Sequence, residues 1–149
     1  MELRQRAVHV GIAIEILYSD EDVFDVKFSA WNGAFGGATR IWVEIGGLDT
    51  LADKISGFPK GPQDSQELVL GAFGREYAGG ATHLRLFCID LAGHSYIESK
   101  IESGEESAGV FQTAIVIMPV EASAIDRFVN GLRKIEKARN GTAVLESRG

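Results

Sequence analysis

The sequence predicts an α+β fold: a curved antiparallel sheet or two-layer β-sandwich of about seven strands, one short mid-chain helix and one C-terminal amphipathic helix. Two observations lead to this prediction. Apolar residues alternate with a period of two through most of the first two-thirds of the chain, which is typical of half-buried strands. A period near 3.6 appears in only two segments, around residue 50 and after residue 120. The length of 149 residues suits one domain with a sizeable core.

The N-terminal third predicts three strands. One face of the first, residues 7–17, consists of Val8, Val10, Ile12, Ile14 and Ile16. The second turns Phe24, Val26 and Phe28 inward. Asn32-Gly33 is a hairpin-type turn signal, and the glycine-rich segment 33–37 then leads into a third strand over residues 39–45.

The middle of the chain predicts a short helix and four further strands. Leu48, Leu51, Ala52 and Ile55 are spaced for two helical turns, which Gly57 and Pro59 end. Strands are expected at about residues 67–73, 82–90, 95–101 and 110–118.

The register of one hairpin can be deduced from its side chains. If Leu91-Ala92 is the tip of the loop, Phe87 faces Tyr96, Arg85 faces Glu98 and His83 faces Lys100. The opposite face then carries Leu84, Leu86, Cys88, Ile97 and Ile101. A slip of one residue would destroy both patterns, so the register is strongly specified.

The last predicted element is an amphipathic helix. Its apolar stripe consists of Ile125, Phe128, Val129, Leu132 and Ile135, and five such side chains predict docking onto the sheet. Pro119 suits the start of this helix, and Asn140-Gly141 is a stop signal. We therefore expect a single domain over residues 1–140 and a flexible C-terminal tail over residues 141–149.

Composition excludes several classes of function. The net charge of −6 argues against nucleic acid as a partner and suits a basic protein partner. The single cysteine, Cys88, forms no internal disulfide. His9 and Glu15 interrupt the apolar run at residues 7–17, and no segment approaches the roughly 18 uninterrupted apolar residues of a membrane span. We expect no membrane partner and a cytoplasmic location.

Catalytic, cofactor and metal motifs are not recognisable, so we expect no enzyme. The glycines at 33–37 are followed by neither a lysine nor a helix, which disfavours a phosphate-binding loop. Asp90 and His94 flank one turn and could act as an acid and a base. A metal site needs a third ligand, and His83 lies several residues away from this turn, while His9 belongs to another strand.

The candidate binding residues are mainly aromatic. Trp31, Phe35 and Trp42 are expected on or beside the face of the first hairpin opposite Phe28 and Val43. Exposed there, they would be typical of an interface, with another protein or a second copy of the chain. Alternatively, another layer of the same domain covers them. The candidate binding residues also include His94 and Tyr96, which belongs to the predicted Phe87–Tyr96 pair. An acidic run, Glu102, Glu105 and Glu106, could dock a basic partner or form a solvated loop.

In outline the chain resembles small bacterial proteins without an assigned role. The features are the run Phe28–Gly37, the short helix ending before Phe58-Pro59, the Gly93-His94 hairpin and the closing helix with Ile125-Asp126-Arg127-Phe128. The order of elements is also similar to that of WapI-like immunity proteins, and this resemblance implies a protein that binds and blocks a toxin domain. We therefore expect a non-enzymatic protein-binding module of bacterial type. The alternative is a small-molecule-binding β-sheet and helix domain, a class that includes enzymes, with an apolar cavity of roughly 300 Å3 or more beneath the C-terminal helix.

Overall fold

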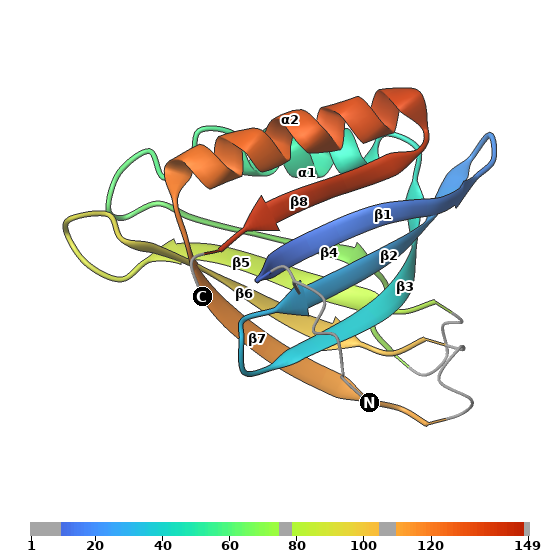
Figure 1. Ribbon diagram of the computed structural model, residues 1–149, viewed down its shortest axis with the longest axis horizontal. Coiled ribbons are helices and arrows are strands. Elements are labelled where there is room, and N and C mark those ends of the chain that lie inside the picture. The colour runs from blue at the N-terminus through green and yellow to red at the C-terminus, as the bar shows by residue number, and fades with distance from the viewer. Residues whose placement is uncertain (1–9, 75–78, 105–109, 148–149) are drawn as a thin grey trace, which may run out of the picture.

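The computed structural model describes residues 10–74, 79–104 and 110–147. Within these ranges the chain forms two four-stranded antiparallel sheets and two helices, arranged as a two-layer sandwich (Figure 1). Sheet A has the strand order β3-β2-β1-β8, and sheet B has the order β4-β5-β6-β7. The predicted α+β class is confirmed.

Sheet A is built from the N-terminal hairpins and the last strand. Its members are β1 (Gly11–Ser19), β2 (Val23–Trp31), β3 (Gly36–Glu44) and β8 (Gly141–Glu146). The alternation expected from the sequence decides its faces, because Ile12, Ile14, Phe24, Val26, Phe28 and Ile41 are all buried on the inner side.

Sheet B is a meander of β4 (Ser65–Gly71), β5 (Ala81–Cys88), β6 (Ser95–Glu102) and β7 (Thr113–Val120). The register predicted for its central hairpin is confirmed: Phe87 pairs with Tyr96, Arg85 with Glu98 and His83 with Lys100. Leu84, Leu86, Ile97 and Ile101 are buried and join the inner face of sheet A in one apolar core. Cys88 is half-buried and packs against this core.

Two helices lie along one side of the sandwich. These are α1 (Gly47–Ile55) and α2 (Ala122–Ala138), with α1 behind α2 in the view of Figure 1. All five side chains of the predicted stripe on α2 are at most 6% exposed, and burying each contributes about 1.5–3 kcal/mol. Neither helix of the described ranges has the length and apolar character needed to cross a membrane.

The two helices are joined by a buried carboxylate. Glu136 of α2 accepts hydrogen bonds from the backbone N–H groups of Gly46, Leu48 and Asp49, at 3.1 to 3.3 Å. The first N–H groups of a helix have no partner within the helix, and α1 lacks a side-chain cap of its own. Glu136 therefore caps α1 from a neighbouring helix, where its negative charge also suits the helix dipole.

The sequence assigns residues 141–149 to a flexible tail, whereas the structure places most of them in a strand. Residues Gly141–Glu146 form β8, which pairs with β1 from Gly11↔Glu146 to Ile16↔Gly141. Arg139 and Gly141 adopt positive φ values of 60° and 105° and turn the chain back after α2. Ala143 and Leu145 then enter the core, and this burial holds the strand in place.

Pro119 does not begin the C-terminal helix, as the sequence had suggested. It belongs to β7, and α2 starts at Ala122 after Glu121. β7 is the outer strand of sheet B, where a proline is tolerated because its missing N–H can face away from the neighbouring strand. The additional strand β8 also explains why the sheets contain eight strands where about seven were expected.

Candidate functional site

The outer face of sheet A exposes the first group of candidate residues. Trp42 lies on β3 and Phe35 in the β2–β3 turn, and they are 53% and 69% exposed, so no layer of the described chain covers them. Trp31, at the end of β2, is half-buried. Because Trp31 pairs with Gly36, six residues before Trp42 on β3, the two tryptophans lie about 20 Å apart. The predicted trio therefore does not form one cluster.

The turn that carries Phe35 is locally well defined. The Asn32 side-chain oxygen accepts the N–H groups of Ala34 and Phe35, at 2.9 and 2.8 Å, and Gly33 has a φ of 96°. The Asn32 amide also donates to the carbonyl of Ile117 in sheet B, at 3.0 Å. The glycine-rich segment is thus a hairpin connection, and Asn32 ties it to the opposite sheet.

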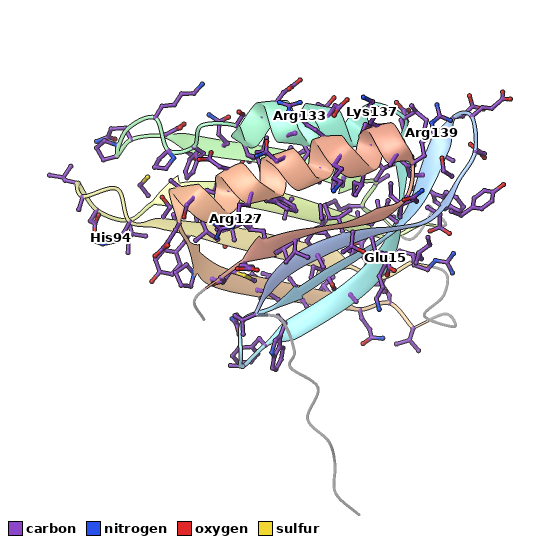
Figure 2. The ribbon with its side chains drawn as sticks, turned by 45° about the horizontal axis from the view of Figure 1, so that its top comes forward. Glu15, His94, Arg127, Arg133, Lys137 and Arg139 are labelled. Atoms are coloured by element: carbon purple, nitrogen blue, oxygen red, sulfur yellow. The ribbon has the colours of Figure 1, made fainter. Side chains whose placement is uncertain are left out.

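The other two candidate residues, His94 and Tyr96, lie together at the far end of sheet B. They line a pocket of about 420 Å3, whose further lining includes Pro59, Ile89, Pro119 and Glu121. Tyr96 stacks on Phe87 with ring centroids 6.3 Å apart, as the predicted cross-strand pair requires. Figure 2 shows His94 in the loop that projects from this end of the sandwich.

Asp90 orients His94 at the mouth of this pocket. The Asp90 carboxylate lies 2.6 Å from Nδ1 of His94 and also accepts the backbone N–H of His94 at 3.1 Å. These two hydrogen bonds lower the pKa of Asp90 below its ordinary value, and the bond with the His94 ring has the larger effect. The pairing leaves Nε2 of His94 as the ring nitrogen available to another group.

The neighbouring hydroxyl does not extend this pair into a nucleophilic triad. Ser95 donates to the carbonyl of Gly93 at 3.0 Å and lies 3.7 Å from the Cys88 sulfur. No group of three or more potential metal ligands occurs among the described residues, and His9 lies outside them. The Asp90–His94 arrangement can hold a hydrogen-bonding ligand or transfer a proton.

The outer face of sheet B links this pocket to a broader surface. The strand registers arrange the side chains in rows across β4 to β7. One row is aromatic and apolar, with Phe87, Tyr96 and Pro119. The next row contains Glu67, Arg85, Glu98 and Ile117. The row beyond it contains Val69, His83, Lys100 and Ile115.

Charged and apolar groups on this face are held in place by one another. Arg85 lies 3.6 Å from Glu98 and 4.2 Å above the ring of Phe87, and His83 lies 3.5 Å from Glu67. Ile115 and Ile117 on β7 are 59% and 44% exposed. The two helices lie along the side of the sandwich, so neither helix of the described chain covers this face (Figure 1).

Sequence reasoning missed Ile115, Ile117 and Val69. Ile115 and Ile117 lie in an apolar run, Ala114 to Met118, in which alternate residues are equally apolar. Only the pairing of β7 with β6 shows that Val116 and Met118 point inward. Period-two reasoning needs a polar face, and β7 does not provide one.

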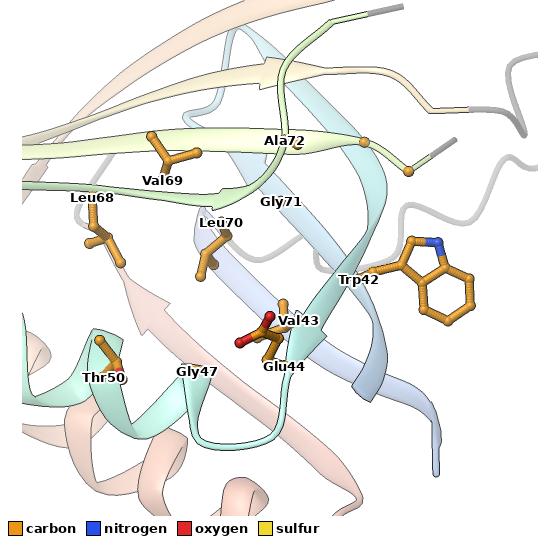
Figure 3. A pocket seen from close by; sticks show the side chains of 12 residues that line it. Trp42, Val43, Glu44, Gly47, Thr50, Leu68, Val69, Leu70, Gly71 and Ala72 are labelled. Atoms are coloured by element: carbon orange, nitrogen blue, oxygen red, sulfur yellow. The ribbon is translucent and has the colours of Figure 1, made fainter. Parts of the chain in front are cut away.

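A second hollow, of about 590 Å3, lies between β4, the end of β3 and the start of α1 (Figure 3). Leu68 and Leu70 point from β4 towards it, and Glu44 and Thr50 line its other walls. Trp42 stands at the rim with its indole directed away. The apolar stripe of α2 packs into the core, and this hollow lies beside α1.

The acidic run is not a uniform solvated patch. Glu102 is buried and accepts the backbone N–H of Gly74 at 2.7 Å, so its carboxylate serves a loop contact. Glu105 and Glu106 lie outside the described residues.

Comparison of the chain with models of protein families, with curated proteins and with solved structures finds no match.

Proposed function

We propose that this protein is a non-enzymatic protein-binding module of bacterial type, and that the outer face of sheet B is its binding surface. The observation that supports the proposal is the bare face itself. It combines the exposed Ile115 and Ile117 with the stacked Phe87 and Tyr96 and with Arg85 held over the ring of Phe87. Aromatic residues and arginine are enriched in protein interfaces, and exposed apolar patches of this kind mark binding sites.

The charge distribution supports a partner with a basic rim. The chain has a net charge of −6, and several of its cations gather on α2, including Arg127, Arg133 and Lys137 (Figure 2). The face of sheet B is therefore approached more easily by a basic partner than α2 is. An immunity-like role, in which the face covers a toxin domain, is one specific form of this proposal. The single cysteine suits a reducing compartment such as the cytoplasm.

The test is capture of a partner from the native cell lysate, followed by affinity measurement with that partner. We expect one saturable protein partner whose affinity falls about tenfold or more for Tyr96→Ala and for the double variant Ile115→Thr/Ile117→Thr, as hot-spot residues require. Threonine keeps the strand propensity of isoleucine.

Leu17→Thr is the matched control, because Leu17 on the outer face of sheet A is 44% exposed, as Ile117 is. It should leave the affinity unchanged. Absence of a partner across several salt concentrations, or equal effects of Leu17→Thr and of Ile115→Thr/Ile117→Thr, would contradict the proposal.

A second candidate function is small-molecule binding in the pocket beside His94. The Asp90-oriented imidazole and the Tyr96 phenol converge on a cavity whose volume lies in the range of ligand sites. A fragment screen followed by NMR should then give binding that His94→Asn weakens and Leu17→Thr does not. If the fragments shift no resonance of the pocket residues, this alternative fails.

A further inference from the structure

The four outer strands of the two sheets differ in how their free edges are covered. The edge of β7 is contacted at two residues: Asn32 donates to the carbonyl of Ile117, and Ser147 donates to the carbonyl of Pro119 at 2.5 Å. Pro119 itself has no N–H to leave unpaired. Natural proteins cover sheet edges in this way because an open edge is a template for another strand.

On sheet A, the edge of β3 is contacted at one residue, and the edge of β8 lies against α2. On β3, the carbonyl of Arg40 accepts the N–H of Gly80 at 2.8 Å. On the other side of the sheet, α2 lies along β8 (Figure 1), so closely that a side chain added at Gly131 would meet Ala143 at 3.3 Å.

The backbone of β4 that faces outward can be identified from the hydrogen-bond pattern of sheet B. The N–H of Ile89 donates to His94, so the odd-numbered residues of β5 bond to β6. In an antiparallel sheet the bonded side alternates along a strand, so even-numbered residues of β5 bond to their β4 partners, such as Leu68. The main-chain groups of Glu67 and Val69 therefore point away from the sheet.

These outward groups have no partner in the part of the chain that the structure describes. The hydrogen bonds formed there by turns, loops and side chains include none to the main chain of Glu67 or Val69. The hollow of about 590 Å3 lies directly beside this edge, and Leu68 and Leu70 point towards it (Figure 3). Unpaired backbone groups next to an apolar hollow are the requirements of β-strand addition.

We propose that an extended segment of a partner protein adds to β4 as a fifth strand of sheet B. The segment runs antiparallel to β4, since antiparallel pairs predominate in sheets of this kind. Its alternate residues are apolar and enter the hollow beside Leu68 and Leu70. This inference rests on the proposed protein-binding function, and it names the segment of the partner and a second contact surface, the edge of β4.

The charges around the edge define the segment further. Glu67 is exposed on β4 and Glu44 is exposed on the wall of the hollow, whereas the described lining contains no lysine or arginine. A lysine or arginine among or beside the apolar residues of the segment thus meets a carboxylate.

The probe is an acetylated, amidated peptide, Lys-Val-Thr-Val-Thr-Val-Lys, carrying a fluorophore for anisotropy measurements with the full chain. Two N-methylated forms are compared with it, one methylated at the valines and one at the threonines. Strand addition uses the N–H groups of one alternate set only. We expect one form to lose affinity by about tenfold or more and the other to bind within about twofold of the parent peptide.

Two variants of the protein itself, in place of changes to the peptide, test the same edge of β4. Val69→Pro removes an outward N–H without removing a bond to β5, and prolines are tolerated at such edge positions. It should abolish peptide binding, whereas Val69→Thr should preserve it. If Val69→Pro does not fold, the comparison of the two methylated peptides decides alone.

The outcomes separate this inference from the proposed function. No binding of the parent peptide, or equal effects of the two methylation patterns, overturns strand addition. If the captured partner is then still lost on Ile115→Thr/Ile117→Thr, the binding function of the outer face stands without it. Peptide binding with the expected pattern supports strand addition even if no partner of the outer face is captured.

Discussion

Glu136 illustrates how one side chain can determine the position of a whole helix. Its carboxylate satisfies N–H groups of α1 that no residue of α1 caps. Removing a charged acceptor from buried donors costs about 1.5–3 kcal/mol. We expect Glu136→Ala to lower the free energy of unfolding by about that amount, measured by urea denaturation.

The matched controls for Glu136 are on the same helix and at the same position. Lys137→Ala, at an exposed site, should change the free energy of unfolding by no more than about 0.5 kcal/mol. Glu136→Gln keeps one acceptor oxygen and should fall between the two. Equal stability of the Glu136 and Lys137 variants would contradict the capping role.

The Asp90–His94 pair gives a prediction in pH. The pKa of Asp90 is lowered in the folded chain by hydrogen bonds from the ring and the backbone of His94. The ionised carboxylate therefore stabilises the folded loop above the ordinary aspartate pKa of about 3.9, and this contribution is lost as the pH falls through the lowered pKa.

An NMR titration of the side-chain carboxyl carbon measures this effect. In His94→Asn the ring contact is lost while the backbone N–H remains, so the pKa of Asp90 should rise towards its ordinary value without reaching it. An unchanged pKa in this variant would show that the ring does not hold the carboxylate.

How far the sequence predicts single residues depends on the distance to their partners. The Phe87–Tyr96 pair follows from a hairpin whose loop tip is visible in the sequence, and the structure confirms it. The capping by Glu136 joins residues about 90 positions apart, and nothing near Glu136 in the sequence indicates α1. Contacts between residues far apart in the sequence can be predicted only once the fold is known.

At the scale of elements, β8 shows the same limit. Its sequence, Gly-Thr-Ala-Val-Leu-Glu, is short and follows a helix stop, so it is typical of a frayed end. What makes it a strand is the open edge of β1, more than 120 residues earlier, and the space in the core that Leu145 fills. The strongly periodic strands and α2, by contrast, were predictable from their own residues.

Leu145→Ala tests the contribution of β8 to the core. Leu145 is fully buried, so its truncation should lower the free energy of unfolding by about 2–5 kcal/mol. Val144→Ala, at a half-buried position on the opposite face of the strand, should cost clearly less. A negligible effect of Leu145→Ala in urea denaturation would be the behaviour of a frayed tail and not of a core strand.

At the scale of the whole molecule, both helices lie along the side of the sandwich, and neither covers an outer face of the described sheets (Figure 1). The two faces support different assemblies. Trp42 and Phe35 on sheet A could serve an interface between two copies of this chain. Sedimentation velocity at high concentration examines that third hypothesis: a dimer should dissociate on Trp42→Ser, and a monomer would exclude it.

The central claim is that sheet B is the binding side of the molecule. Its most direct test is the amide hydrogen-exchange footprint of the complex with the captured partner, compared with the free protein. We expect slower exchange on β4 and on the strands β5 to β7, with α2 and the outer face of sheet A unchanged. A footprint confined to α2 or to sheet A would contradict the claim.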